Sequence, residues 1–176
     1  MNDGSSFLQR GSLKKVNAVC LFIMAASVLP VFTGCARQNF IPGTRIPETR
    51  QNREIIEVVE RYRRAMTNKE IGTLISMAHP DYFEHSGSHK AEHHYGYDGL
   101  KKVLATRLKQ LRTLRYNIKY RRVNWLSDKK VEVQIYIDAS FQLAVADDTD
   151  TWDRFTQHNK IVLVKDNDRW LFLSGM

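Results

Sequence analysis

The sequence contains very little cysteine. Its 176 residues include two cysteines, Cys20 and Cys35. Cys20 lies inside an apolar N-terminal stretch that we expect to be removed, and Cys35 lies where that stretch ends. No thiol is then left for a disulfide bond, a metal site or a nucleophile. A chain without a spare cysteine also avoids oxidative mispairing after export to an oxidising compartment.

Several motifs that carry chemistry are absent as well. The sequence contains no phosphate-binding glycine loop, no serine nucleophile elbow and no paired-cysteine motif. The formal net charge is +8, but no basic run longer than two residues is interleaved with aromatic side chains. We therefore expect no nucleic-acid partner and no cofactor. With 43% hydrophobic and 26% charged residues, the composition is typical of one globular domain with short appendages.

Residues 1–34 have the organisation of an export signal. Lys14 and Lys15 form a positive region, and an almost entirely apolar run follows from Val16 to Phe32. Pro30 interrupts a helix near the end of this run, and small residues come after it. These features predict a cleaved signal peptide. A plain transmembrane anchor is an alternative, but a run of this length is short for a bilayer span.

The segment around Cys35 predicts lipidation. Phe32, Thr33, Gly34 and Cys35 resemble a lipobox, although an aliphatic residue is usual where Phe32 stands. The resemblance implies that Cys35 receives diacylglycerol and becomes the first mature residue, unless an ordinary signal peptide merely ends near a cysteine. Since Ala36 rather than an aspartate follows, it further implies the outer membrane, facing the periplasm. Residues 35–47 contain Pro42, Gly43 and Pro47 without periodicity and are expected to be a tether.

Residues 48–176 are expected to form one domain that begins with helices. Apolar residues at helical spacing predict a helix over 48–66 and a short one that ends at Pro80. A short strand over 82–85 is expected next, followed by a histidine-rich loop over 86–95. A third helix begins at Asp98, with an apolar stripe of Leu100, Leu104, Leu108 and Leu111.

The rest of the domain is expected to be strands. Tyr116, Ile118 and Tyr120 alternate with polar residues, whereas Val123 and Trp125 alternate in the opposite phase. This change of phase predicts a β-bulge near Arg121 and Arg122. Period-two alternation continues over 131–143, and further strands are expected over 151–164 and 170–173. Helices followed by a run of antiparallel strands indicate an α+β fold with a curved sheet wrapped around about three helices.

The domain resembles the nuclear transport factor 2-like superfamily, which includes ketosteroid isomerases, scytalone dehydratase and polyketide cyclases. The resemblance rests on residues 58–62, 65–66 and 71–75, on the Gly-Tyr-Asp-Gly-Leu run of 96–100, and on the closing strands. It covers about residues 48–175 and implies a cone-shaped fold with an apolar pocket at its open end. The resemblance predicts the fold of the domain more specifically than it predicts a function.

The resemblance also suggests catalytic candidates. Tyr62 falls where ketosteroid isomerases place an oxyanion-holding tyrosine, although a core tyrosine on a buried helix face would look the same. Glu84 or His85 falls near the place of the family's general base. The family's protonated acid on the penultimate strand is missing, because Asn159 or Lys160 stands there.

A histidine–carboxylate pair is a further candidate. His158 and Asp138 would form it if both faced inward, and together with His85 they would resemble a scytalone dehydratase site. Asp138 is out of phase with its strand's apolar series, however, which favours solvent or an interface. His89, His93 and His94 are weak candidates for metal ligands, since the spacing matches no zinc consensus, and a flexible polar loop is the simpler interpretation.

Two classes of function remain after these exclusions. The first is a non-catalytic envelope lipoprotein that binds a small apolar molecule or a protein partner. The second is a small-molecule isomerase, dehydratase or cyclase that uses Glu84 or His85 as general base. The missing acid favours the first. We predict a pocket lined by some of Tyr62, Tyr82, His85, Trp125 and His158, and a homodimer formed through the sheet face that carries Tyr136.

Overall fold

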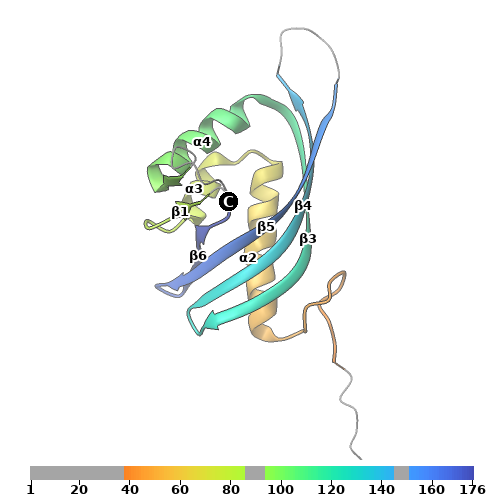
Figure 1. Cartoon of the computed structure of the whole chain (residues 1–176), viewed down its shortest axis with the longest axis vertical. Helices are drawn as coiled ribbons and strands as arrows, with labels where there is room; N and C mark the ends of the chain where they lie inside the picture. The colour runs from red at the N-terminus through yellow and green to blue at the C-terminus, as the bar shows by residue number, and fades with distance from the viewer. Residues whose placement is uncertain (1–37, 86–93, 145–150) are drawn as a thin grey trace, which may run out of the picture. The chain divides into compact units, whose positions relative to one another are not determined.

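The computed structural model describes residues 38–85, 94–144 and 151–176. They form helices α2 (Arg50–Thr67), α3 (Ile71–Met77) and α4 (Tyr97–Lys109), and strands β1 (Phe83–Glu84), β2 (Tyr95–Gly96), β3 (Leu111–Ser127), β4 (Lys130–Leu143), β5 (Asp153–Asp166) and β6 (Arg169–Ser174). Strands β3 to β6 make one antiparallel sheet in sequence order, and β1 pairs with β2. Three helices followed by a curved four-stranded sheet confirm the predicted α+β plan (Figure 1).

The sheet curves around α2, and its concave face holds most of the core (Figure 1). Helix α2 begins at Thr49, whose side chain accepts a hydrogen bond from the backbone N–H of Asn52. It buries the stripe that the sequence predicted, including Ile55, Val59 and Tyr62. On β4 the alternating residues Val131, Val133, Ile135, Ile137 and Ala139 are all buried in the same core as these helix residues.

A register shift in β3 confirms the predicted bulge. It falls between Tyr120 and Arg122, so the residues that face the core change phase there. Tyr120 lies opposite Ile135 before the shift, and Val123 lies opposite Val133 after it. The turn from β5 to β6 is tight and places Asn167 and Asp168 at positive φ.

The predicted tether is wrong over residues 39–47, which belong to the folded domain. Phe40 pairs with Pro47, and the backbone N–H of Ile41 donates to the carbonyl of Ile46 at 2.9 Å. Ile41 and Ile46 are buried against Ile56 of α2. Two isoleucines among the proline and glycine residues supply the apolar area that holds this turn in place.

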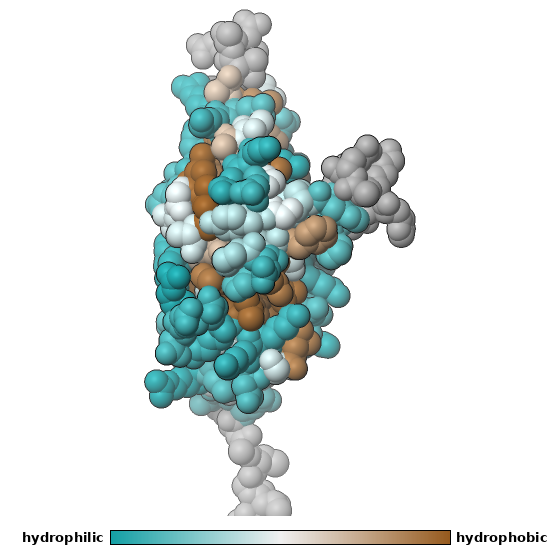
Figure 2. Space-filling model, turned by 90° about the vertical axis from the view of Figure 1, so that its left-hand side faces the viewer, coloured by the Kyte–Doolittle hydropathy of each residue, from teal (hydrophilic) through white to brown (hydrophobic). Residues whose placement is uncertain are grey.

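Two further features concern the surface. Figure 2 shows the side on which α3, α4 and β1 lie; hydrophilic side chains cover most of it, with hydrophobic ones between them. None of the helices in the described ranges is long and apolar enough to span a membrane. The predicted signal peptide and Cys35 lie outside the described residues.

Candidate functional site

A cavity lies between the C-terminal half of α2, helix α4 and the concave face of the sheet. Its wall includes apolar side chains from all three, together with Met176, which follows β6: Met66, Val103, Ile135, Ile137, Phe155 and Met176. Polar groups lie among them: Tyr62, Glu84, Tyr95, Arg107, Tyr116, Gln157 and Asn159. An apolar wall with a few placed polar groups is the usual composition of a small-molecule site.

The cavity opens across the edge of the sheet. Strand β6 pairs with β5 only from Val162 to Asp166, so the first half of β5 is an edge. Gln134, His158 and Lys160 also lie beside the cavity, but the register of β4 and β5 places them on the convex face. Arg121 of β3 lies on that face as well, over the ring of Tyr136. These four residues belong to the convex surface and not to the interior.

Two tyrosine hydroxyl groups meet inside the cavity. Tyr62 of α2 and Tyr116 of β3 both line it, and their oxygen atoms are 3.2 Å apart. The Tyr62 ring also packs on Phe172 of β6, with ring centroids 5.0 Å apart. The pair has two hydroxyl protons, of which one joins the two oxygens and the other can donate to an acceptor on a ligand. Tyr62 is also part of the main hydrophobic core, which agrees with the interpretation of a core tyrosine on a buried helix face.

Burial raises the pKa of both hydroxyl groups. The pKa of Tyr116 rises to about 12 because the group is desolvated, although the hydrogen bond from Tyr62 partly opposes this. Burial, followed by the neighbouring Tyr116, raises the pKa of Tyr62 well above its ordinary value. Both groups are therefore neutral near pH 7 and act as hydrogen-bond donors rather than as bases.

We expect the domain to lose stability at alkaline pH. Burial is also the main cause of the raised pKa values of Tyr82, Tyr95 and Tyr120. A tyrosine whose pKa is raised on folding keeps its proton longer in the native state, so stability is complete below about pH 10 and falls as the pH rises toward 12. Tyrosine absorbance and circular dichroism, recorded together, should change in one step above pH 10. Gradual ionisation of these five tyrosines with the fold intact would contradict the buried environments.

Glu84 of β1 lies on the cavity wall, and residues outside the cavity hold its carboxylate by hydrogen bonds. Its Oε2 atom accepts hydrogen bonds from the hydroxyl of Tyr82 and from the backbone N–H of Gly175, both at 2.8 Å. The Tyr82 hydroxyl also accepts from the backbone N–H of Met176 at 3.1 Å. Gly175 has φ of +88°, and a Cβ atom there would collide with the backbone of Lys160. A glycine at this position lets residues 175 and 176 reach Glu84.

Two predicted pocket residues lie elsewhere, which corrects the prediction. Tyr82 is buried behind Glu84 and does not reach the cavity surface. Trp125 lies near the other end of α2, where its indole N–H donates to Asn52 Oδ1 at 2.9 Å and its ring packs on Trp170. The physical reason is position along β3: Tyr116 lies at Tyr62, and by Trp125 the strand has reached the first turn of α2.

The predicted histidine–carboxylate pair does not form, because both residues lie on the convex face. Asp138 binds Arg154 through two hydrogen bonds of 2.8 and 2.7 Å, and this contact lowers the pKa of the carboxyl group. His158 packs on Tyr136 with ring centroids 5.1 Å apart. His85 lies at the cavity mouth, exposed, against Phe83 and His94. A site composed of His85, His158 and Asp138 is therefore excluded.

Asn159 of β5 faces the cavity, whereas Lys160 does not. Asn159 lies opposite Ile135, and its amide donates to the carbonyl of Gly175 at 3.0 Å. Lys160 lies on the convex side, 3.9 Å from Glu132. The polar lining of this stretch is thus an amide, which cannot donate a proton as a carboxylic acid does.

Two of the three predicted metal ligands lie outside the residues that the structure describes. These two are His89 and His93, whereas His94 contacts the rings of Phe83 and His85. Within residues 38–85, 94–144 and 151–176, no three His, Cys, Asp or Glu side chains gather as a metal site.

The predicted homodimer surface is charged rather than apolar. Tyr136 lies on the convex face beneath Lys119 and Arg121, at 6.0 and 5.8 Å from its ring centroid, and Arg115 covers Trp152 nearby. Asp138 and Glu132 lie on the same face, paired with Arg154 and Lys160, so the face is a mixed-charge surface. The homodimer stays a prediction, and its expected basis in a large apolar sheet surface is wrong.

Several site residues were missed at the sequence level. Tyr116, Tyr95, Arg107 and Gln157 come from four different elements that the fold brings together. A signal existed for Tyr116, which begins the alternating series of β3 and so had to share a face with Ile118 and Tyr120. Arg107 lies four residues after Val103 on α4, so both side chains reach the cavity from one face of that helix.

Comparison of the sequence with protein families and with curated proteins finds no match. Solved structures do match. A provisionally assigned scytalone dehydratase from Novosphingobium aromaticivorans has a TM-score of 0.62 at 15% identity, covering 71% of this chain and 80% of its own. A ketosteroid isomerase-like protein from Erwinia carotovora gives 0.60 at 15%, covering 73% and 95%. An NTF-2 like protein of unknown function from Shewanella oneidensis gives 0.52 at 14%, covering 71% and 96%.

These identities are low enough that the likeness concerns the fold and not the activity. The order of helices, the curved antiparallel sheet and the concave cavity agree with the expectation from the sequence. The chain has the nuclear transport factor 2-like α+β cone fold.

Proposed function

We propose that this protein is an envelope lipoprotein whose domain binds a small amphipathic molecule without transforming it. The observation that carries the proposal is the Tyr62–Tyr116 hydroxyl pair inside a cavity with an apolar wall. Aliphatic side chains such as Ile135 and Ile137 favour a hydrocarbon portion. The free proton of the pair suits a carbonyl or hydroxyl oxygen on the ligand.

The other candidates for chemistry are poorly arranged for turnover. One carboxylate oxygen of Glu84 already accepts two hydrogen bonds, Asn159 replaces an acid, and His158 lies on the convex face. These arrangements favour binding over catalysis. The alternative partner is an envelope protein that docks at the cavity mouth. Binding of a small ligand is favoured over it because the polar groups lie inside the cavity.

The anchor part of the proposal rests on the N-terminal residues. Lys14, Lys15, the apolar run and Cys35 support export and lipidation. Ala36 after the cysteine supports the outer membrane, with the domain in the periplasm. A domain that binds a sparingly soluble molecule next to a bilayer would suit storage, sensing or delivery of that molecule.

Removing either hydroxyl group of the pair should weaken binding. We expect Tyr62→Phe and Tyr116→Phe each to lower the affinity for an oxygen-containing ligand extracted with the protein by about tenfold, the equivalent of one lost hydrogen bond. Tyr120→Phe is the matched control, because its hydroxyl donates to Glu60 outside the cavity at 2.7 Å. Isothermal calorimetry with the recovered ligand measures the effect. Equal affinities for all three variants would contradict the role of the pair.

A second candidate function is proton transfer by Glu84. It is favoured because Glu84 and the tyrosine pair line the same cavity, and because some structural neighbours are named as dehydratase or isomerase-like proteins. Glu84 would remove a proton from a carbon next to a carbonyl group, while the tyrosines donate to the carbonyl oxygen.

Replacing the carboxylate separates the two functions. If Glu84 is a base, Glu84→Gln should lower turnover of the recovered ligand by a hundredfold or more while binding persists. If the domain only binds, the ligand will take up no deuterium at carbon when it is incubated with wild-type protein in deuterated water. Glu84→Gln will not change that result. Deuterium uptake catalysed by the wild type and lost in the variant would replace the binding proposal with the enzymatic one.

A further inference from the structure

The folded turn at residues 39–48 leaves almost no free chain between the proposed lipid and the domain. Three peptide units join the Cα atoms of Cys35 and Gln38, and they span at most about 11 Å. Beyond them, Asn39 accepts from the backbone N–H of Glu48 at 2.8 Å, and Ile46 is 1% exposed. A chain lipidated at Cys35 would therefore hold this end of the domain against the bilayer.

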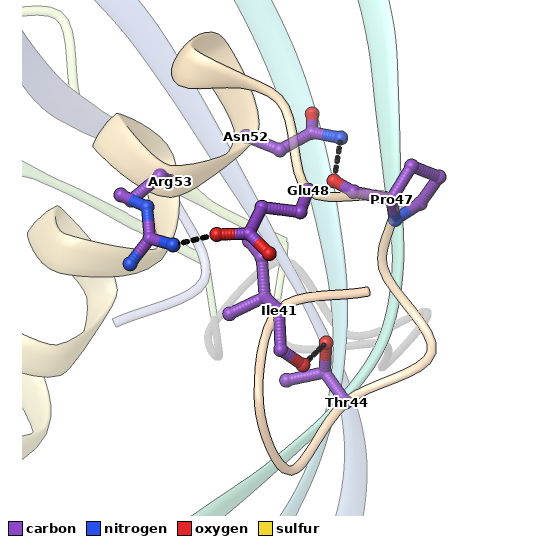
Figure 3. Close-up of polar contacts among 6 residues, drawn as sticks. All are labelled: Ile41, Thr44, Pro47, Glu48, Asn52 and Arg53. Carbon is purple, nitrogen blue, oxygen red and sulfur yellow. Dashed lines mark hydrogen bonds and ion pairs between the residues drawn. The ribbon is translucent and has the colours of Figure 1, made fainter. Parts of the chain in front are cut away.

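This end is tied rigidly to the rest of the fold. The Asn52 side chain donates to the carbonyl of Pro47 at 2.9 Å and accepts from Trp125 of β3. Thr44 donates to the carbonyl of Ile41, and Arg53 pairs with Glu48 (Figure 3). The turn, the first turn of α2 and the β3–β4 turn thus form one surface at the same end of the domain (Figure 1). We call it the anchor end.

The anchor end carries the groups that a bilayer surface attracts. Phe40 is 47% exposed and Leu126 is 57% exposed. Four exposed cations belong to the same segments: Arg45, Arg50, Lys129 and Lys130. Within the described residues none of these four takes part in an ion pair, and the exposed acids of these segments are Asp128 and Glu48, of which Glu48 pairs with Arg53. Aromatic and aliphatic side chains among unpaired cations favour an anionic lipid interface.

We propose that the anchor end docks on the anionic lipid surface that holds the anchor, so that the cavity faces away from this bilayer. The inference rests on the lipidation in the proposed function and adds an orientation to it. Tyr62 follows Asn52 by ten helical residues, which places the tyrosine pair about 15 Å farther along α2. Ligand would then be exchanged through the aqueous side and not directly with the anchoring bilayer.

Fluorescence quenching from the bilayer tests this orientation. The full chain is expressed with Ser127→Cys in the β3–β4 turn or Thr106→Cys on α4, both exposed positions. A fluorescent label is attached to the new cysteine. The mature protein is purified, its mass is measured for diacylglycerol, and it is reconstituted into phosphatidylethanolamine–phosphatidylglycerol vesicles that contain a headgroup nitroxide lipid. We expect the label at residue 127 to be quenched at least twofold more than the label at residue 106.

Matched variants identify the contacts that cause the difference. Phe40→Ser combined with Lys129→Ser should reduce the difference by at least half, because one apolar contact and one cation are removed while the lipid still holds this end near the bilayer. Phe83→Ser should preserve it, since Phe83 is 43% exposed but lies on β1. Equal quenching at both positions in protein that carries lipid overturns the docking proposal and leaves the anchor standing. A mass without diacylglycerol overturns the anchor, and the docking proposal falls with it.

Discussion

Replacing Cys35 by alanine is expected to abolish incorporation of labelled fatty acid completely. The sulfur of Cys35 is the predicted acceptor of diacylglycerol, and alanine offers no atom to acylate. Two acyl chains bind a bilayer stably, whereas a single chain holds a protein only marginally, so the lipid accounts for membrane attachment. The measurement is metabolic labelling of cells that express the full chain, followed by separation of membrane and soluble fractions.

The second cysteine provides the control for this experiment. Cys20→Ala should leave labelling and membrane attachment unchanged, because Cys20 lies inside the predicted signal peptide. An unprocessed Cys35→Ala chain could stay in the membrane through its apolar run, so labelling is the decisive result. Undiminished labelling of Cys35→Ala would show that the lipid is attached to another residue.

Periodicity in the sequence was sufficient to predict most of the fold. The stripe Ile55, Val59 and Tyr62 has helical spacing, and the β4 series from Val131 to Ala139 has period two, so each element indicates which face is buried. The phase change at Arg121 and Arg122 predicted a bulge that the register confirms. These signals are local, which is why they are readable in one sequence.

The tether prediction failed for a different reason. Pro42, Gly43 and Pro47 suggested an unstructured linker, and they do lie in a turn with Gly43 at φ of +75°. Ile41 and Ile46 nevertheless pack on Ile56, a contact between parts of the chain that no short-range period shows. Composition alone does not separate a linker from a turn that docks on the domain.

The site was predictable only in part, because it depends on contacts between distant elements. Tyr62 and Glu84 line the cavity as candidates, whereas Trp125 and His158 were assigned to it before the strand faces were known. The partnership of Tyr62 with Tyr116 joins residues 54 positions apart. Likewise, the support of Glu84 by Gly175 depends on where β6 ends, which the sequence pattern does not specify.

Filling the cavity should eliminate binding, and this is the second large effect we expect. Val103 lies on the cavity wall of α4 and is partly exposed, so a tryptophan there has access to the open space without replacing a core residue. Lys102 is exposed on the same helix and does not line the cavity. Val103→Trp should therefore occupy the volume that a ligand needs, whereas Lys102→Trp adds the same side chain outside it.

Binding of the fluorescent probe 1-anilinonaphthalene-8-sulfonate to these proteins tests the central claim most directly. Wild type and Lys102→Trp should bind the probe with equal affinity and gain melting temperature from it, because binding to the native state stabilises that state. Val103→Trp should keep its fold by circular dichroism and bind at least tenfold more weakly. Probe binding that is equally strong in Val103→Trp, or absent from the folded wild type, would contradict a ligand-binding cavity.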